Sequence, residues 1–263
     1  MKDYGLVSII TPSYNCAQYI GATIESIQAQ TYRNWELLIT DDCSKDDSCK
    51  VIESYITKDS RIKLFKLNKN SGAGVARNYS IKEAAGRFIA FCDSDDRWYP
   101  DKLEKQLEFM VENNYSLTYS SYDTCDENGK INGIVNCLSY LNYPRILRDN
   151  GIGCLTAIYN AEKIGKHYMP LIRKRQDWCL WIDIIKKIGK AYGYQNSLAL
   201  YRVRSGSISS NKVEMIRYNF DVYNKVLGYN AAVSALILGF YFIPYYIYKK
   251  QKQKKDYKKH LKR

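Results

Sequence analysis

The segment that decides the fold is FIAFCDSDDRWYPDKLE, residues 88–104. Residues 88–92 form an apolar run typical of a buried strand, and the run stops at the acidic residues 93–96. A helix is predicted to follow, with Asp101 as its N-cap. In an open α/β sheet, ligands bind where the strands end. Carboxylates packed this densely repel one another unless a cation such as Mg²⁺ or Mn²⁺ lies among them. An acidic turn with a helix cap is the alternative.

Two other segments have the same layout. WELLITDDCSKDD (residues 35–47) is an apolar strand followed by two aspartates, and LVSIITPSYNCAQYI (residues 6–20) is a strand followed by a turn at 12–15 and a helix. Repeated alternation of strand, turn and helix predicts a mostly parallel sheet with right-handed crossovers. Its ligand crevice should carry these four residues together: Tyr14, Asp42, Asp93 and Asp95.

Five motifs carry a resemblance to a known family. SIITPSYN (8–15), TDDCSKDD (40–47), GAGVARN (72–78), FCDSDDRWYPDKLE (91–104) and RQDWCLW (175–181) resemble, in this order and spacing, the family 2 glycosyltransferases of GT-A fold. The resemblance covers residues 5 to 210 approximately. It implies an α/β fold, with a mostly parallel nucleotide-binding sheet flanked by helices, and transfer of a sugar from a nucleotide-sugar.

The chain divides into three parts. Residues 1–120 form the expected nucleotide-sugar-binding half, residues 121–225 the acceptor-side half of the same domain, and residues 226–263 a hydrophobic segment with a polybasic tail. Within these parts the pattern predicts a strand at 116–121, a hairpin turn at 126–130, loops to about 170, an amphipathic helix at 178–190, a strand with a Gly/Ser turn at 198–210, and a helix at 211–226.

The resemblance assigns roles in binding the diphosphate. Asp95 matches the second acid of the family's DxD signature, which ligates a metal, Mn²⁺ or Mg²⁺, that bridges the diphosphate oxygens. Asp93, the first acid, would contact the ribose or a metal-bound water. Asp96 is either part of this site or a cap of the next turn. Arg77 follows a Gly-rich turn at a helix start, where guanidinium and backbone amides suit phosphate; a solvated helix arginine is the alternative.

Three residues are expected around the nucleobase. By resemblance, Asp42 accepts a hydrogen bond from the base, as the matching position does with uracil. Tyr14 can stack on the ring, and the Pro12 carbonyl can contact its edge. Asp41 shares the Asp42 motif and is expected to order the turn. Because the chain has 25 tyrosines, an ordinary core or surface aromatic is the alternative for Tyr14.

A carboxylate is the candidate general base. Asp177 corresponds to the acid of the family's (E/R)D-W/Y motif, and an ordinary helix N-cap is its alternative role. The chain has 2 histidines, of which only His167 lies outside the basic tail, and no motif supports it. Many relatives carry a metal-binding histidine where this chain has Arg204. Arginine cannot ligate a metal but can neutralise diphosphate, which predicts weaker metal binding without nucleotide.

The net charge of +13 is concentrated at the C-terminus. From residue 249 onward, eight lysines and one arginine face one aspartate, and no nucleic-acid motif accompanies them, so a nucleic-acid partner is not expected. Residues 226–248 carry no charged residue. Their apolar centre, 231–243, is shorter than the roughly 20 residues of a membrane span. A helix lying in the cytoplasmic leaflet, next to anionic headgroups, is favoured; a full span and a helix packed on the domain stay open.

These observations predict an inverting, metal-dependent hexosyltransferase that is peripheral or monotopic on the cytoplasmic face of the bacterial inner membrane. The 8 cysteines show no zinc spacing, and the N-terminus leads directly into a strand without a signal segment. By resemblance, the donor is a UDP-sugar (galactose first, glucose second) and the acceptor undecaprenyl-diphosphate-GlcNAc, in a β-1,3 linkage for O-antigen or capsule assembly. A non-enzymatic membrane- or polyanion-binding protein and a nucleotidyltransferase are the alternatives.

Overall fold

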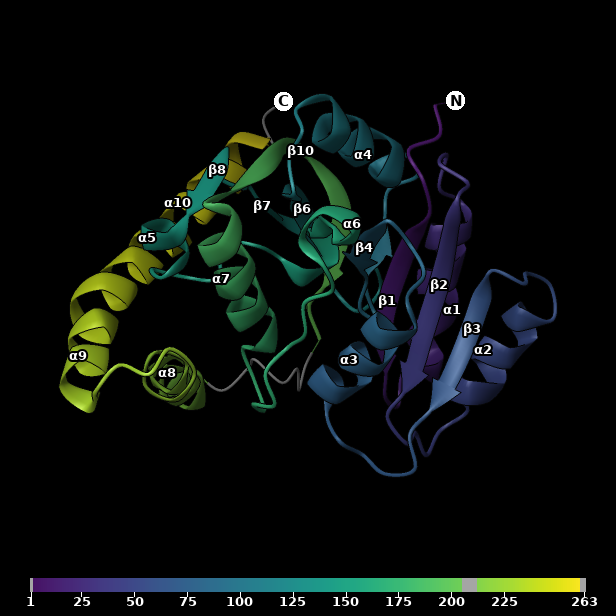
Figure 1. Ribbon diagram of the computed structural model, residues 1–263, viewed down its shortest axis with the longest axis horizontal. Helices are drawn as coiled ribbons and strands as arrows, with labels where there is room; N and C mark the ends of the chain where they lie inside the picture. The colour runs from purple at the N-terminus through teal and green to yellow at the C-terminus, as the bar shows by residue number, and fades with distance from the viewer. Residues whose placement is uncertain (1, 205–211, 261–263) are drawn as a thin grey trace.

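A computed structural model describes residues 2–204 and 212–260. The strands in this part of the chain form one mixed sheet in the order β3-β2-β1-β4-β9-β6-β10-β5, with β7 paired to β6 and β8 to β10 (Figure 1). They are β1 (Val7–Ser13), β2 (Trp35–Asp41), β3 (Ile62–Lys66), β4 (Phe88–Phe91), β5 (Arg97–Trp98), β6 (Leu117–Cys125), β7 (Ile131–Val135), β8 (Tyr140–Asn142), β9 (Ile158–Asn160) and β10 (Lys190–Arg202).

Helices cover both faces of this sheet and extend along one side of it. The α-helices are α1 (Ala17–Gln28), α2 (Ser48–Ile56), α3 (Ala73–Glu83), α4 (Lys102–Glu112), α5 (Tyr143–Ile146), α6 (Ala161–Ile164), α7 (Gln176–Ile188), α8 (Lys212–Asp221), α9 (Ala231–Leu236) and α10 (Ile243–His260). A 3₁₀ turn spans Cys154–Thr156, and π-helical turns span Val222–Val226 and Ile237–Phe242.

The N-terminal half is the parallel sheet that the sequence predicts. Strands β3, β2, β1 and β4 pair in parallel, and their side chains alternate between two apolar cores. Ile9 packs with α1, α2 and α4 on one face, whereas Ile10 packs with α3 and α7 on the other. Both faces are therefore buried, as is usual for parallel sheets with crossover helices.

The C-terminal half differs from the prediction of loops between 121 and 170. Strand β9 lies antiparallel between β4 and β6, and β7 and β8 add antiparallel edges. The hairpin turn at 126–130 is confirmed, because the Asp126 amide donates to the Lys130 carbonyl at 3.0 Å. A three-residue strand such as β9 is too short to produce a period-two pattern, so its tertiary pairing is invisible in the sequence.

Two local predictions are wrong in detail. Asp101 occupies the N-cap position of α4, but its side chain makes no capping hydrogen bond and pairs with Lys105 instead. Strand β1 continues through Pro12 to Ser13, so the predicted turn at 12–15 begins later. The Gly/Ser turn predicted up to residue 210 lies outside the described residues beyond Arg204.

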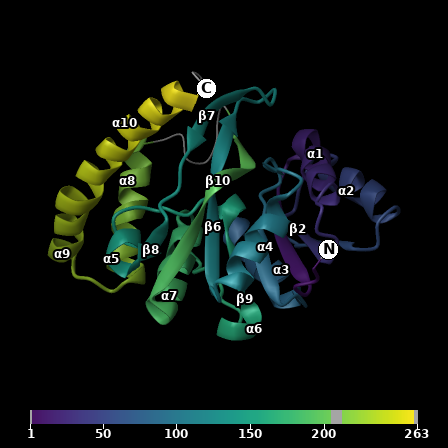
Figure 2. The ribbon, with the colours of Figure 1, turned by 90° about the horizontal axis from the view of Figure 1, so that it is seen from above.

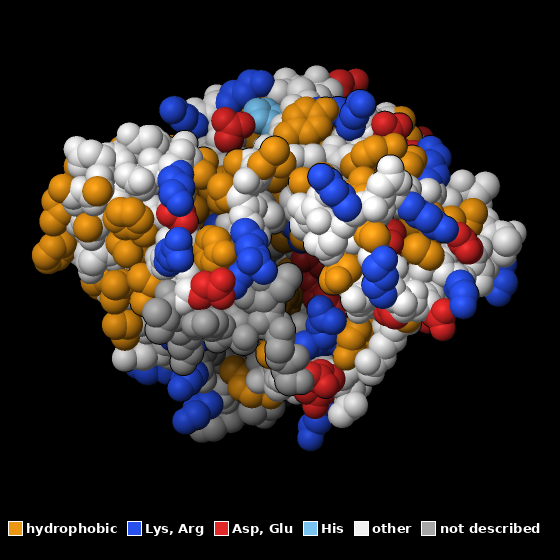
Figure 3. All heavy atoms as spheres, turned by 90° about the horizontal axis from the view of Figure 1, so that it is seen from below, with side chains coloured by type: hydrophobic (Ala, Val, Ile, Leu, Met, Phe, Trp, Pro, Cys, Tyr) orange, Lys and Arg blue, Asp and Glu red, His pale blue; other side chains and the backbone are white. Residues whose placement is uncertain are grey.

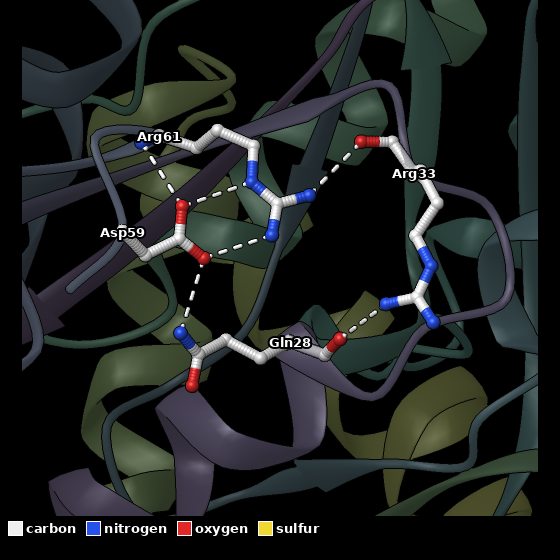
Figure 4. A network of polar contacts seen from close by, with 4 residues as sticks. All are labelled: Gln28, Arg33, Asp59 and Arg61. Carbon is white, nitrogen blue, oxygen red and sulfur yellow. Dashed lines mark hydrogen bonds and ion pairs between the residues drawn. The ribbon is translucent and has the colours of Figure 1, made fainter.

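A polar network joins the C-terminal end of α1 to the segments that precede β2 and β3 (Figure 4). Asp59 accepts hydrogen bonds from Arg61 Nε at 2.9 Å and from Gln28 Nε2 at 3.0 Å, and Arg61 Nη1 donates to the Arg33 carbonyl at 3.1 Å. The Arg61 guanidinium also lies 3.6 Å above the Trp35 ring. These contacts hold the strand ends opposite the site in register.

The C-terminal helix packs on the domain along one face and exposes the other. Residues 231–258 run as one helix, long and apolar enough by length and composition to cross a membrane. Phe242 is buried against Trp178, with ring centroids 5.9 Å apart, and Lys249 pairs with Asp149. Phe240 is 80% exposed. The helix lies along the border of the molecule in Figures 1 and 2. The expectation of a helix packed on the domain therefore holds for one face of this helix.

A buried lysine in α4 makes the free energy of unfolding depend on pH. Lys102 is fully buried, lies 4.2 Å from the Trp98 ring and donates to Gln106 Oε1 at 2.9 Å. Burial lowers the pKa of Lys102 from its ordinary value of 10.5 to about 7. Between these pH values the unfolded chain binds one proton more than the folded one, so this group makes stability rise with pH.

Replacing Lys102 with methionine should therefore stabilise the protein most at pH 7, with a difference from the parent that shrinks as the pH rises toward 10. Thermal unfolding midpoints of Lys102→Met and parent, measured across this range, test the expectation. A difference that stays constant with pH would show that Lys102 is charged in the folded protein.

Candidate active site

The predicted site residues of the parallel half gather at the carboxyl edge of the sheet. In the strand register, Ser13 lies opposite Asp41 and Ile10 opposite Phe91, so the segments that follow β1, β2 and β4 leave the sheet side by side. Figure 3 views the molecule from this edge and shows acidic side chains in a hollow near its centre, with basic side chains beside them. Tyr14 stands at this edge with 48% of its surface exposed.

Asp42 holds the Gly-rich turn that precedes α3. It is buried, and its two carboxylate oxygens accept hydrogen bonds from the backbone amides of Ser71 at 2.6 Å and Gly72 at 2.7 Å. Carboxylate oxygens have two lone pairs each, so a further donor such as a nucleobase N–H can still bind. Pro12 is buried in β1 beside it. The nucleobase roles of Asp42, Tyr14 and Pro12 stay predictions.

The turns around the site are held in unusual backbone conformations. Among the non-glycine residues described, positive φ occurs at Asn15, Cys43, Asn114 and Arg175, and all of these except Asn114 lie within the site motifs. Asp41 orders the turn after β2, as predicted, by accepting from the Ser44 amide at 2.8 Å and from Ser13 Oγ at 3.1 Å. Strained residues of this kind persist where surrounding contacts over-determine them, and they concentrate at functional sites.

Arg77 is a buried ion-pair partner and not a solvated helix residue. Its Nη2 lies 2.6 Å from Asp93 Oδ1, and only 8% of the residue is exposed. Its Nε is buried without a hydrogen-bond partner among the described residues. Burial disfavours its charge, but Asp93 and, more weakly, Asp177 raise the pKa of Arg77. A guanidinium with spare donor capacity therefore faces the carboxylates.

Two arginines from the end of β10 complete the acidic cluster. Arg204 Nε lies 2.8 Å from Asp95 Oδ2. The Arg202 amide donates to Asp96 Oδ1 at 2.9 Å, and Arg202 Nε donates to the Asp95 carbonyl at 3.0 Å. Asp96 is buried, and this hydrogen bond joins the end of β10 to the segment that follows β4.

Burial and neighbouring negative charge raise the pKa of two of these carboxylates, Asp95 and Asp96. Burial raises the pKa of Asp95, the Asp93 charge adds to this, and Arg204 opposes it. Burial, followed by the charges of Asp95 and Asp93, raises the pKa of Asp96 well above its usual range. Such shifts are typical of functional sites where like charges are held together, and a bound cation would relieve the repulsion.

These residues fit a divalent cation that takes some of its ligands from the protein and the others from a bound nucleotide. Within residues 2–204 and 212–260, no three His, Cys, Asp or Glu side chains are arranged as a complete metal cage. Asp93 and Asp95 offer hard oxygen donors, and Mg²⁺-type sites commonly use one or two carboxylates together with substrate phosphates and water. Arg204 already occupies one oxygen of Asp95. A metal ligated by Asp95 would therefore share this carboxylate with Arg204.

The candidate base lies at the start of α7. Asp177 is in the first helical turn and is not the N-cap, a position that Arg175 occupies. Asn150 Nδ2 donates to Asp177 Oδ2 at 2.7 Å, which orients the carboxylate. His167 pairs with Asp183 at 2.7 Å, two turns further along α7, so the structure gives it no link to the acids.

Contacts between α3 and α7 bring the start of α7, which carries the candidate base, close to the start of α3. A side-chain carbon added at Gly74 would lie 2.8 Å from Gln176 Nε2, so the two helix starts lie close together and a larger residue at position 74 would displace the Gln176 side chain. Burial raises the pKa of Cys154 well above its usual range, and the charges of Arg77, Asp93 and Asp177 all act on this thiol. The acid that follows β4 and the acid at the start of α7 thus both act on one buried thiol.

The sequence missed three contributors to this arrangement. Arg202 and Asn150 position acids through the bonds above, and Tyr19 of α1 lies within 5.0 Å of Arg202 and 5.3 Å of Arg204 in cation–π contacts. Arg202 stands next to Arg204 in the YRVR segment, which was a usable signal. Asn150 lies in a region without periodicity and gave none.

The chain matches known proteins along most of its length. The family model "Glycosyl transferase family 2" matches residues 8–171. The putative teichuronic acid biosynthesis glycosyltransferase TuaG of Bacillus subtilis is 42% identical over 222 residues, covering 84% of this chain and 88% of the relative. The UDP-Glc:alpha-D-GlcNAc-diphosphoundecaprenol beta-1,3-glucosyltransferase WfgD of Escherichia coli is 42% identical over 224 residues, covering 84% and 86%.

Solved structures share the fold at lower identity. S. aureus TarS 1–349 in complex with UDP-GlcNAc superposes with a TM-score of 0.68 at 22% identity, covering 89% of this chain and 71% of that one. The mannosyltransferase PcManGT of Pyrobaculum calidifontis, in complex with GDP-Man and Mn²⁺, gives 0.66 at 15% identity, covering 90% and 70%. The GT-A fold expected from the motifs is confirmed, and the chain belongs to glycosyl transferase family 2.

Proposed function

We propose that this glycosyltransferase moves a hexose from UDP to the GlcNAc of a polyprenyl-diphosphate-linked acceptor, with inversion to a β-1,3 linkage, in the assembly of a bacterial surface polysaccharide. The observation that carries the proposal is that two acids from different parts of the chain act on one buried guanidinium: Asp93 pairs with Arg77 at 2.6 Å, and the charge of Asp177 also acts on Arg77. This arrangement provides a base and a diphosphate-binding cluster in one hollow.

The names of two relatives support the acceptor class. WfgD and WfaP of Escherichia coli are both named as UDP-Glc:alpha-D-GlcNAc-diphosphoundecaprenol beta-1,3-glucosyltransferases, and this chain is 42% and 38% identical to them. Both names specify glucose, whereas the resemblance carried by the motifs favoured galactose. We therefore place UDP-glucose first among the donors and UDP-galactose second.

The donor would be held from its base to its diphosphate by residues of the parallel half. Pro12, Tyr14 and Asp42 would hold the uracil, and Asp93 would contact the ribose or a metal-bound water. Asp95 would ligate Mn²⁺ or Mg²⁺, which supplies charge stabilisation to the departing diphosphate. Arg77 and Arg204, already beside these acids, would bind the phosphates directly.

Asp177 would act on the acceptor. It would take the proton from the attacking hydroxyl while the new carbon–oxygen bond forms at the anomeric carbon and the bond to the diphosphate breaks. A single displacement of this kind converts an α-linked donor into a β-linked product. Asn150 would keep the second carboxylate oxygen fixed, so that Oδ1 is free for the acceptor.

The two alternative classes receive less support. A non-enzymatic binding protein has no need of the Arg-neutralised cluster of Asp93, Asp95 and Asp96, whose burial costs stability. Membership of the glycosyltransferase family argues against a nucleotidyltransferase.

The direct experiment offers UDP-glucose, UDP-galactose and UDP-GlcNAc to the purified protein with a GlcNAc-diphosphate-lipid acceptor. UDP-glucose with Mn²⁺ should give a disaccharide with a β-1,3 linkage, identified by mass and NMR spectroscopy. EDTA should abolish turnover. Equal turnover with EDTA would refute the metal role, and transfer from UDP-galactose alone would restore the original donor order.

Asp177→Asn keeps the side-chain shape but removes the proton acceptor. Turnover should fall by about 10²-fold or more, while UDP binding by calorimetry stays close to that of the parent. Asp183→Asn, on the same helix but paired with His167, is the matched control and should keep near-parental turnover. A variant of Asp177 that loses thermal stability but retains turnover would show a purely structural role.

The exposed face of the C-terminal helix supports attachment to the cytoplasmic membrane surface. Leu236, Phe240 and Ile247 are 56%, 80% and 53% exposed, and lysines follow them directly along the helix. Apolar burial and attraction to anionic lipids are additive signals for such helices. We place the protein on the membrane as a peripheral or monotopic enzyme.

Ile247→Asp should weaken binding to vesicles of phosphatidylcholine and phosphatidylglycerol by roughly fivefold or more, since it puts a charge on the apolar face. Co-sedimentation measures this. Leu171→Asp, at a residue 81% exposed before α7, is the control and should bind like the parent. Equal binding of both variants would place the membrane contact elsewhere.

A further inference from the structure

A second hollow lies between the C-terminal helix and the body of the domain, apart from the acidic cluster. It has a volume of about 240 Å³. Four basic side chains line it: Arg145 and Arg148 from the α5 region, and Lys249 and Lys252 from α10. We call it the basic cavity. Two carboxylates, Asp149 and Asp256, also line it, so basic groups outnumber acids by two to one.

The two acids of the basic cavity already have partners. Asp149 pairs with Lys249, and Asp256 accepts from Asn136 Nδ2 at 3.1 Å. Arg148 Nε is buried without an acceptor, and no carboxylate pairs with Lys252, in the part of the chain that the structure describes. The cavity thus keeps unneutralised positive charge and spare donors, which suits an anion with several oxygens.

An apolar groove of about 390 Å³ lies next to the basic cavity. It is lined by six apolar or aromatic residues besides Tyr241: Tyr143, Pro144, Leu147, Leu236, Ile237 and Phe240. Tyr241 joins the two spaces, because it lines the groove while its hydroxyl accepts from Arg148 Nη2 at 3.0 Å. The Arg148 guanidinium also lies 4.5 Å from the Tyr241 ring. An anionic head and an apolar chain on one ligand would match this pair.

The basic cavity is connected to the candidate base through three consecutive residues. Asp149 and Gly151 line the cavity, while Asn150 between them donates to Asp177 Oδ2 at 2.7 Å. The Asn150 carbonyl in turn accepts from Lys249 Nζ at 3.4 Å. A group bound in the cavity therefore lies on the other side of a single backbone segment from the catalytic carboxylate.

We propose that the basic cavity binds the diphosphate of the lipid-linked acceptor and that the apolar groove binds its first isoprene units. The sugar attached to this diphosphate would then reach over the 149–151 segment to Asp177. This inference rests on the proposed function for its ligand class. It assigns to the C-terminal helix a second role besides membrane attachment, because Lys249, Lys252 and Phe240 all belong to that helix.

The test uses farnesyl diphosphate as the probe and the full-length protein in one fixed detergent. Calorimetry should show that Lys252→Glu weakens binding about 10-fold, while Lys254→Glu, an exposed lysine of the same helix outside the cavity, changes it less than twofold. Phe240→Asp should weaken farnesyl diphosphate binding but leave that of inorganic pyrophosphate unchanged. Leu171→Asp, at an exposed residue outside the groove and outside the C-terminal helix, is its control. UDP binding should be unchanged in all four variants.

Three results would overturn the inference. Equal losses in Lys252→Glu and Lys254→Glu would mean that the tail attracts anions without a site. Equal affinity of the parent for pyrophosphate and farnesyl diphosphate would remove the groove from the ligand. Transfer to the lipid-linked acceptor with an unchanged KM in both Lys252→Glu and Phe240→Asp would place the acceptor elsewhere and leave the proposed function intact. The expected binding pattern without any sugar transfer would support the site and refute the proposed reaction.

Discussion

Repulsion among three carboxylates at the end of β4 is the constraint on which the rest of the site depends. Asp93, Asp95 and Asp96 lie within four residues, and each is answered by a group from a different part of the chain. Arg77 of α3 pairs with Asp93, Arg204 pairs with Asp95, and the Arg202 amide binds Asp96. The end of β10 is therefore joined to the segment after β4 by charge and hydrogen bonding, at the site of the proposed reaction.

Two further contacts bring helices α3 and α7 together at this acidic cluster. Asp42 captures the amides before α3, which orients the helix that carries Arg77. The close contact between Gly74 and Gln176 then sets the start of α7 against the start of α3. The groups proposed to bind the donor and the acceptor are thus positioned by direct contact between two helix ends. Preorganisation of this kind lowers the cost of aligning reactive groups.

The sequence predicted the parallel half and its acidic edge well, because long apolar strands followed by polar turns leave a clear periodic signal. It located β1, β2 and β4, and it predicted correctly that Asp41 orders the turn after β2. It failed for β9, which is three residues long and is held by pairing with β4 and β6. It also could not foresee that Asp101 would pair with Lys105, since a cap and an i,i+4 ion pair use the same residue types. Asn150 was invisible because its role arises only from tertiary contact with Asp177.

The rigid attachment of the C-terminal helix has a geometric consequence. Phe242 is buried against Trp178 in α7, one residue after the candidate base, and Lys249 is paired with Asp149. Once this helix rests on a bilayer in the way proposed, Asp177 stands at a fixed height above the lipid surface. Only a sugar at one fixed distance from the lipid anchor would then come within reach of Asp177. Acceptor length would be selected by the thickness of the protein between helix and carboxylate, independently of which sugar is recognised.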